Sequence, residues 1–465
     1  MKKQFITSAF FMMFVCLQFV SGQAKYVFYF IGDGMGINQV NLTEVYLSAM
    51  NGERGSASLL MTTFPVASMS ATFSADADVT DSAASGTALA TGSKTNNGYI
   101  GVDAEKNRIE SVAEKAKKAG KKVGIASTVP VNHATPAAFY GHRNDRNMYY
   151  EISQDLITSG FDFFAGAGLY NRDVFYDNSK APDIFPLIEQ AGYTISKGYD
   201  DFKANAGKSK KVMLLHKDWE RADGIPYAID RTSEDLSLKQ MTEAAIDVLM
   251  RDNKKGFFLM LEGGRIDWAG HANDATTNLK EVIDMDDAIK VAFEFYKKYP
   301  KETLIVVTAD HETGGITAGK GRLNIKALQH QKVSQDKLTE RINELYKSKD
   351  GVVSWEEAKN LLTETMGFWK DVPVNWEQEK ILRDAYEETL AKRRDIKDSN
   401  LYSNNALLAA KAKEVMSDIA GIGWATGSHS ADFVPVFAIG AGQELFKAKM
   451  DNTDIPKNII KAGRY

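Results

Sequence analysis

The sequence predicts a three-layer α/β fold, in which a central, largely parallel sheet is covered by helices on both faces. Runs rich in β-branched and aromatic residues alternate along the chain with amphipathic helical patterns, which is typical of such a sheet. The first run, Lys25–Gly32, is apolar almost throughout, as in a strand buried on both faces. The 465 residues suffice for one large domain with insertions or for two domains.

The individual strands are recognised as short apolar runs bounded by polar or turn-forming residues. The predicted strands are Lys25–Gly32, Ala67–Ser74, Lys122–Thr128, Phe161–Gly166, Lys211–His216, Gly256–Gly264, Thr303–Asp310 and Val434–Gly440. A helix is expected between the glycine-rich turn at 33–36 and about Met50. Apolar stripes at helical spacing over 238–249 and 279–293 predict two more helices that pack on the core.

The sequence pattern changes between about Gly321 and Ile419, where long polar helical patterns replace strand signals. One of these patterns opens with a capping box formed by Ser354 and Glu357. We therefore expect a helical insertion over 321–419, carried by an α/β domain made of residues 25–320 and 420–465.

Composition and the first residues bound the location and the partners of the protein. The formal charge of −4 does not favour a general binder of nucleic acids or anionic membranes. Lys2 and Lys3 precede an apolar run that is short for a bilayer span, which predicts a signal peptide over 1–24 and a periplasmic or secreted protein. An uncleaved anchor is the alternative. Because the single cysteine, Cys16, lies in this segment, the mature chain has no disulfide and no thiolate metal site.

The stretch around Ser82 is the first candidate for chemistry. A strand pattern leads into Asp81–Gly92, a run of small residues that predicts a short helix closed by Gly92. Ser82 then lies in the first turn, where free backbone N–H groups and the helix dipole favour an anion or an ionised oxygen. A serine at this position is also a common helix cap, so the position alone does not establish a role.

Metal-binding side chains recur at the ends of the predicted strands, where open α/β sheets place their sites. The residues so placed are Asp33, Glu262, Asp267, His271, Asp310, His311 and His429. Asp267 and His271 are four residues apart, on one face of a helical turn. Aspartate and histidine without cysteine suit zinc in a catalytic site, and an all-oxygen set suits magnesium.

Five motifs give the chain a resemblance to the alkaline phosphatase family. They are "IGDGMG", "VTDSAASGTA", "HATPAAFY", "EGGRIDWAGH" and "TADHETGG", and they occur in the family's order. The resemblance covers almost the whole mature chain, from Asp33 to His429. It implies hydrolysis of phosphate monoesters through a phosphoserine, with two zinc ions and one magnesium ion, and it implies a homodimer.

The resemblance also implies which residues form the site. The implied ligands are Asp267, His271 and His429 for one zinc ion, Asp33, Asp310 and His311 for the other, and Asp33, Thr135 and Glu262 for magnesium. Ser82 is the implied nucleophile, and Arg146 is expected to bind the phosphoryl oxygens with its planar fork, with Arg143 as the alternative.

Two substrate-site positions depart from the best-known bacterial pattern of the family. His133 stands where that pattern has an aspartate, and Trp268 stands where it has a lysine. We expect looser retention of phosphate, because Trp268 supplies no cation; a simple packing role for Trp268 is the alternative.

The same residues are compatible with other functions. A phosphodiesterase or sulfatase of the same superfamily is one alternative, although the sequence around Ser82 is not the Cys/Ser-x-Pro-x-Arg context of sulfatases. A non-catalytic protein that binds metal and phosphate is another, and it has no need of Ser82 beside a full ligand set.

Overall fold

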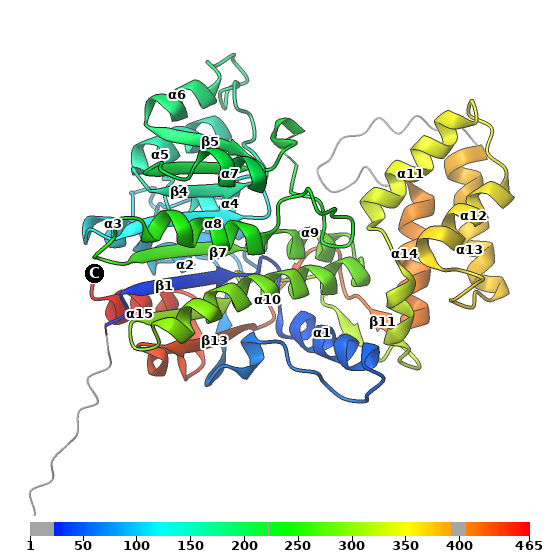
Figure 1. Cartoon of the computed structure of the whole chain (residues 1–465). Helices are drawn as coiled ribbons and strands as arrows, with labels where there is room; N and C mark the ends of the chain where they lie inside the picture. Colours follow the sequence, from blue (N-terminus) through cyan, green and yellow to red (C-terminus); the bar gives the residue numbers. More distant parts are fainter. Residues whose placement is uncertain (1–22, 222, 392–405) are drawn as a thin grey trace, which may run out of the picture.

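The computed structural model describes residues 23–221, 223–391 and 406–465, and its central element is a ten-stranded sheet (Figure 1). The order of the strands is β14-β2-β13-β8-β1-β7-β3-β4-β6-β5. Their bounds are β1 (Tyr26–Ile31), β2 (Val66–Ala71), β3 (Lys122–Ser127), β4 (Phe163–Gly166), β5 (Tyr193–Lys197), β6 (Lys211–Leu215), β7 (Phe257–Glu262), β8 (Thr303–Thr308), β13 (Val434–Gly440) and β14 (Met450–Asp451). The signal peptide is predicted over 1–24, and positions 1–22 of this segment lie outside the described residues.

The sheet is parallel except where β13 enters it, antiparallel to both β2 and β8. Two short antiparallel ladders lie outside it. They pair β9 (Glu312–Thr313) with β12 (His429–Ser430), and β10 (Thr317–Ala318) with β11 (Ile422–Gly423). The mostly parallel sheet with helices on both faces confirms the predicted fold class.

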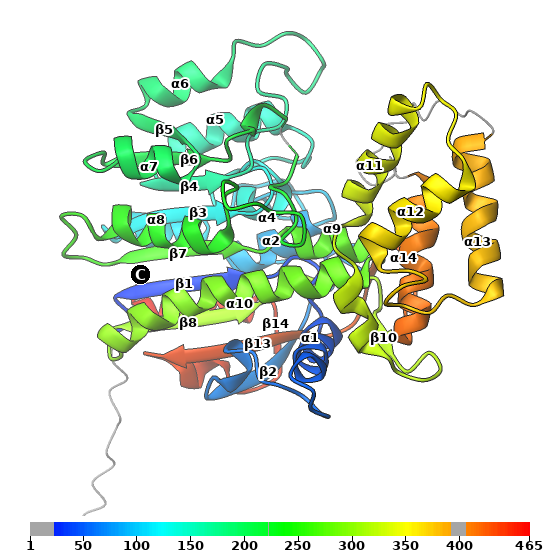
Figure 2. The same cartoon turned by 45° about the vertical axis from the view of Figure 1, so that its right-hand side comes forward.

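Helices cover both faces of the sheet, with α8 and α10 on one face and α2, α3 and α15 on the other (Figures 1 and 2). The helices of the α/β part are α1 (Ile37–Met50), α2 (Ser82–Thr91), α3 (Val112–Lys118), α4 (Ala134–Ala137), α5 (Tyr149–Ser159), α6 (Ile184–Gln190), α7 (Tyr199–Asn205), α8 (Leu238–Met250), α9 (Arg265–His271), α10 (Ala275–Lys298) and α15 (Asp454–Gly463). The other helices are α11 (Gln335–Ser348), α12 (Trp355–Met366), α13 (Trp376–Tyr386) and α14 (Leu407–Ala420). Among the described residues, no helix combines the length and the apolar character needed to cross a bilayer.

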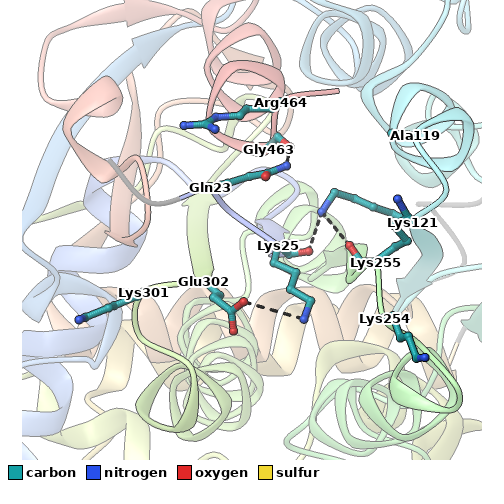
Figure 3. A pocket seen from close by; sticks show the side chains of 10 residues that line it. All are labelled: Gln23, Lys25, Ala119, Lys121, Lys254, Lys255, Lys301, Glu302, Gly463 and Arg464. Carbon is teal, nitrogen blue, oxygen red and sulfur yellow. Dashed lines mark hydrogen bonds and ion pairs between the residues drawn. The ribbon is translucent and has the colours of Figure 1, made fainter. Parts of the chain in front are cut away.

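The end of the sheet at which β1 begins carries a group of cations around a cavity of about 500 Å³ (Figure 3). The charged residues lining this basal cavity are Lys25, Lys121, Lys254, Lys255, Lys301, Glu302 and Arg464. Lys121 is the buried member, at 5% exposure, and its Nζ donates to the carbonyls of Ala24, Lys25 and Lys255 at 3.3, 2.7 and 3.4 Å. Three backbone carbonyls thus accept hydrogen bonds from the buried ammonium of Lys121.

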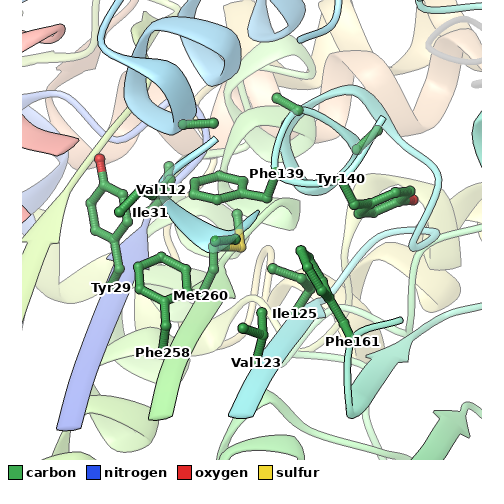
Figure 4. Packing of buried hydrophobic residues seen from close by; sticks show 14 of the residues in the cluster. Tyr29, Ile31, Val112, Val123, Ile125, Phe139, Tyr140, Phe161, Phe258 and Met260 are labelled. Atoms are coloured by element: carbon green, nitrogen blue, oxygen red, sulfur yellow. The ribbon is translucent and has the colours of Figure 1, made fainter. Parts of the chain in front are cut away.

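The core consists of two layers, because successive side chains of a strand point to opposite faces. In β1, Val27, Tyr29 and Ile31 belong to one hydrophobic cluster, and Tyr26, Phe28 and Phe30 belong to the other. Figure 4 shows the first layer, where Tyr29 and Ile31 lie beside Phe258 and Met260 of the neighbouring strand. A strand buried on both faces explains the continuous apolar run in the sequence.

A third hydrophobic cluster joins α11–α14 to the α/β part. It contains Leu42 and Tyr46 of α1 and Leu279 of α10 together with buried residues of the four helices, such as Leu338 and Leu408. The four helices stand at one side of the molecule, beyond α1 and α9 (Figures 1 and 2).

The predicted strands all form, with ends that differ by at most three residues, and the two helical stripes are mostly buried. The strands β5 and β14 are corrections, because the sequence analysis did not predict them. Only Tyr193 and Ser196 are buried in β5, so its apolar run is too weak to stand out, and β14 is only two residues long.

Candidate active site

Three neighbouring parallel strands end in buried carboxylates at the same edge of the sheet. Asp33 follows β1, Glu262 is the last residue of β7, and Asp310 follows β8; β1 lies between the other two strands. All three side chains have no exposed surface. The parallel topology therefore brings together three negative groups that are far apart in the sequence.

Ser82 reaches this edge from the first turn of α2. The helix begins as predicted: Asp81 caps it by accepting from the N–H of Ala84 at 2.9 Å, and Gly92 closes it in the left-handed conformation, at φ 78°. Every residue of the helix is buried, and a Cβ at Gly86 would lie 3.2 Å from Cα of Thr135. The small side chains thus let the helix pack closely and leave Ser82 2% exposed, at the positive end of the helix dipole.

A first group of metal-type ligands consists of Asp267, His271 and His429. Nδ1 of His271 lies 2.8 Å from the carbonyl of Gly427, and Nδ1 of His429 lies 2.8 Å from the carbonyl of Thr80. A carbonyl only accepts, so each Nδ1 carries the ring proton. The two Nε2 atoms then face each other with lone pairs at 3.2 Å, an arrangement that a bound cation stabilises.

His429 reaches this group through a very short ladder. In the pairing of β12 with β9, His429 lies opposite Thr313, two residues beyond His311. The hydroxyl of Thr313 donates to Oδ1 of Asp267 at 2.5 Å, and it lies 3.2 Å from Nδ1 of His311. Thr313 therefore orients ligands of two neighbouring groups, a role that the sequence analysis missed.

A second group consists of Asp33, Asp310 and His311. Nε2 of His311 lies 3.3 Å from both carboxylates and 3.2 Å from Oγ of Ser82. Since the hydroxyl of Thr313 donates to Asp267, it accepts from Nδ1 of His311, and the lone pair of Nε2 faces the carboxylates. The nucleophile candidate thus touches this group directly.

A third group consists of Asp33, His133 and Glu262. One oxygen of Glu262 accepts from the hydroxyl of Ser127, and the other is buried without a hydrogen-bond partner. Thr135 lies on α4, two residues after His133, and its hydroxyl donates to Asp310 at 3.4 Å. The side chain of His133 therefore joins this group, while the Thr135 hydroxyl lies beside the second one.

The electrostatics of these groups indicate that positive charge belongs among them. Both oxygens of Asp33 are buried without a hydrogen-bond donor, and burial, reinforced by the charge of Asp310, raises its pKa well above the usual range. Burial also raises the pKa of Asp310 to about 7 and that of Glu262 to about 8. Carboxylate oxygens and imidazole nitrogens with free lone pairs are suitable ligands for divalent cations, and a bound cation keeps such carboxylates ionised.

Asp267 behaves differently from the other carboxylates of the site. Burial alone would raise its pKa, but positive charge at the positions of His271 and His429 lowers it to about 2, so a cation in this group keeps Asp267 ionised. With one carboxylate against two around Asp33, the histidine-rich group is the less negative one, and it suits zinc better.

The two candidate arginines have different surroundings. Arg143 donates to both oxygens of Asp155, at 2.9 and 2.6 Å, so its fork is already occupied. Arg146 donates to Oδ2 of Asp81 at 2.9 Å, next to Ser82, and its other terminal nitrogen lies 3.3 Å from Nε2 of His133.

His133 and Trp268 line the same side of the site. Their rings meet edge to face, with centroids 6.1 Å apart. Burial, together with the charge of Arg146, lowers the pKa of His133 to about 3, so the ring is neutral. Trp268 is 8% exposed and packs with Val129, Tyr227 and Ala269.

A family model described as alkaline phosphatase matches residues 24–162 and 187–465. Alkaline phosphatase 4 of Bacillus subtilis is 35% identical over 458 residues, which cover 95% of this chain and 90% of that protein. The human tissue-nonspecific alkaline phosphatase is 34% identical over 334 residues, which cover 62% of this chain and 63% of the human protein.

Solved structures of alkaline phosphatases are similar over nearly their whole length. The cold-active enzyme of a psychrophilic Shewanella superposes with a TM-score of 0.78 at 28% identity, covering 94% of this chain and 99% of that one. The enzyme of the Antarctic bacterium TAB5 superposes with a TM-score of 0.65 at 27% identity, covering 96% of this chain and 99% of that one. Two further TAB5 structures are of variants with a histidine replaced by aspartate or by glutamate, described as having magnesium bound in the M3 site.

Proposed function

The chain belongs to the alkaline phosphatase family, whose members are metal-dependent phosphoric monoester hydrolases, and from this premise we propose that Ser82 carries the reaction as a nucleophile. The observation that carries the proposal is the position of the Ser82 hydroxyl, 3.2 Å from Nε2 of His311 in the second ligand group. This group shares Asp33 with the third group.

The residues fit three bound cations. We assign one zinc ion to Asp267, His271 and His429, a second to Asp33, Asp310 and His311, and a magnesium ion to Asp33, Thr135 and Glu262, with His133 beside it. The unpartnered oxygens of Asp33 and Glu262 support these assignments. When bound, such ions lower the pKa of a nearby hydroxyl and offset the charge of phosphoryl oxygens.

The chain's own residues supply the nucleophile and its orientation. Oγ of Ser82 loses its proton to solvent and attacks phosphorus. The bond from phosphorus to the ester oxygen breaks, and the ester oxygen leaves with the electron pair and takes up a proton to give the alcohol. Water then loses a proton and attacks the phosphoserine, the bond from phosphorus to Oγ breaks, Oγ regains its proton, and inorganic phosphate is released. Two in-line displacements retain the configuration at phosphorus. The N–H groups at the start of α2 face the same region and favour its negative charge.

Arg146 orients the phosphoryl group in this proposal. Its planar fork suits two phosphoryl oxygens. Asp81, the residue before Ser82, holds the guanidinium in place through an ion pair of 2.9 Å between Oδ2 and Nη1 of Arg146. Arg143 is assigned a structural role, because Asp155 occupies its fork.

His133 and Trp268 define the variant of the third metal site in this proposal. A neutral histidine makes the site less negative than an aspartate would, and Trp268 brings no cation to the phosphate. Two TAB5 variants in which aspartate or glutamate replaces a histidine are described with magnesium bound in the M3 site, and by analogy we propose that a carboxylate in place of His133 would favour magnesium. We expect weak retention of phosphate, which raises kcat where product release limits turnover.

The proposal extends to location and assembly. We propose export to the periplasm after removal of residues 1–24, a homodimer, and an insertion over 321–419 within the α/β domain. The third hydrophobic cluster, which gathers the buried residues of α11–α14 and packs them against α1 and α10, supports the insertion. N-terminal sequencing of the exported protein and its mass in solution test the first two points.

The test of the activity compares three substrates with and without a chelator. We expect the metal-loaded protein to hydrolyse p-nitrophenyl phosphate much faster than bis-p-nitrophenyl phosphate or a sulfate ester. Chelation should abolish the activity, and added zinc and magnesium should restore it. Preference for the diester or the sulfate ester, or turnover that survives removal of all metal, would contradict the proposal.

A further inference from the structure

Arg265 is a buried cation that the reaction described above does not use. It is the first residue of α9 and is 7% exposed, and its Nε has no hydrogen-bond partner. Its guanidinium carbon lies 3.5 Å from the ring centroid of Tyr227 and 4.7 Å from that of Trp268. The guanidinium is thus placed by aromatic rings, which attract cations through their faces.

One of the two rings that Arg265 contacts, that of Trp268, belongs to the wall of the proposed phosphate site. Trp268 lies one turn further along α9, and its indole meets the ring of His133 edge to face. His133 in turn lies 3.3 Å from the guanidinium of Arg146. A continuous series of contacts therefore runs from Tyr227 through Arg265, Trp268 and His133 to the group proposed to bind phosphate.

Two carboxylates and a loop surround Arg265. Burial raises the pKa of Asp230 to about 6 and also raises that of Asp336, and the positive charge of Arg265 offsets part of each rise. On the loop before Tyr227, Gly224 lies against the guanidinium: a Cβ there would meet Cδ of Arg265 at 2.5 Å and its Nε at 3.0 Å. The loop thus has room for Arg265 only because residue 224 has no side chain.

We propose that Arg265 is a positioning residue that holds Trp268 against His133 and thereby sets the affinity of the site for phosphate. This inference rests on the proposed function, because it uses the phosphate site assigned above. Arg265 itself touches no reacting atom. Its planar, stacked cation holds the indole in one orientation, and its loss frees the wall of the site to move away from the phosphoryl group.

The test measures binding of inorganic phosphate to the metal-loaded full chain by calorimetry, so that it does not depend on turnover. We expect Arg265→Met to weaken phosphate binding about three- to tenfold, less than the whole of a desolvated cation–π contact, because Arg265 acts on the site only through Trp268. Arg265→Lys should recover only part of the loss, because an ammonium restores the charge but not the planar stack. The KM for p-nitrophenyl phosphate should rise and kcat should not fall, because weaker binding of the product cannot slow its release.

Gly224→Ala provides an independent perturbation of the same contact. Its backbone does not require the left-handed conformation, so the added methyl group acts mainly on the Arg265 side chain. We expect it to weaken phosphate binding in the wild-type background and to add nothing in the Arg265→Met background. Such non-additivity shows that both changes act through one contact.

Arg231→Met is the matched control. Arg231 lies on the same loop and is equally buried, but it pairs with Asp284 through both terminal nitrogens, at 2.7 and 3.1 Å, away from Trp268. We expect it to lower the thermal midpoint without changing phosphate binding.

The inference is overturned if Arg265→Met weakens phosphate binding no more than Arg231→Met, or if Gly224→Ala has the same effect in both backgrounds. It is also overturned if the metal-loaded wild type binds no phosphate. A wild type that binds phosphate but does not hydrolyse p-nitrophenyl phosphate contradicts the proposed function alone, because the binding comparison still decides the role of Arg265.

Discussion

The two ends of the central sheet both bury charged groups, but they neutralise the charge in different ways. At the end where β1 begins, Lys121 is 5% exposed, and its ammonium donates to three backbone carbonyls. At the end where β1 finishes, Asp33 has no exposed surface, and neither carboxylate oxygen has a donor.

The difference separates structural charge from functional charge. A buried ion whose partners the chain supplies is complete by itself, whereas a buried ion without partners requires something from outside the chain. Both ends are equally part of one sheet, so burial alone does not identify a site. The hydrogen bonds of the buried charge do: among the described residues, neither oxygen of Asp33 has a donor, whereas the ammonium of Lys121 has three carbonyl acceptors.

Removal of the Ser82 hydroxyl should give the largest effect at the catalytic end. We expect Ser82→Ala to lower kcat/KM by at least about 10³-fold, as loss of a nucleophile does, with no loss of thermal stability. Ser85→Ala is the matched control on the same helix, since Ser85 donates to the carbonyl of Asp310 at 2.6 Å instead of facing the ligands. Steady-state kinetics of both variants decide the point. Equal losses in the two variants would mean that the helix, and not the Ser82 hydroxyl, is what matters.

The basal end should respond in stability and not in activity. Lys121→Met leaves buried carbonyls without their donor, so we expect unfolding free energy to fall by about 1–3 kcal/mol with kcat and metal content unchanged. Lys254→Met removes an exposed cation from the same cavity and should change stability by less than about 0.5 kcal/mol. Denaturant titration measures both. A loss of metal or turnover in Lys121→Met would break the distinction between the two ends.

The same lysine should give stability a pH dependence of a definite sign. Burial, with a smaller effect of the charge on Lys25, lowers the pKa of Lys121 to about 8. Between that pH and about 10.4, the usual lysine value, only the unfolded chain binds the proton, so stability rises with pH in this window and the gain is lost as pH falls through 8. We expect the stability difference between wild type and Lys121→Met to grow by about 1 kcal/mol per pH unit there. A flat difference would contradict the assignment.

A lysine introduced at position 268 should add a cation beside the proposed phosphate site. We expect Trp268→Lys to tighten competitive inhibition by phosphate about three- to fivefold and to lower kcat, because an ammonium near the site holds the product. Trp268→Met removes the ring without adding charge and serves as the control. An inhibition constant that is the same in Trp268→Lys and Trp268→Met would reject a charge effect at this position.

The helix that carries Ser82 could be predicted closely from sequence, because its signals are local. Asp81 supplies the cap and Gly92 the left-handed end, and both act within a few residues of the helix they bound. The strands that end at Asp33, Glu262 and Asp310 were equally visible as apolar runs. Their meeting at one edge follows from the parallel sheet.

Other parts of the site depend on contacts that sequence patterns do not contain. The ladder that brings His429 beside Thr313 is two residues long, too short to leave a periodic signal. The orienting hydroxyl of Thr313 and the choice between Arg143 and Arg146 depend on which carboxylate lies nearby after folding. Tertiary partners, not propensities, decide these features.

The most direct test of the account is the metal content of purified Ser82→Ala and Asp33→Asn proteins, measured beside the wild type together with turnover of p-nitrophenyl phosphate. The account predicts that Ser82→Ala binds as much zinc and magnesium as the wild type and has lost turnover, whereas Asp33→Asn has lost both turnover and part of its metal. Wild-type turnover without bound metal, or full metal content in Asp33→Asn, would contradict it.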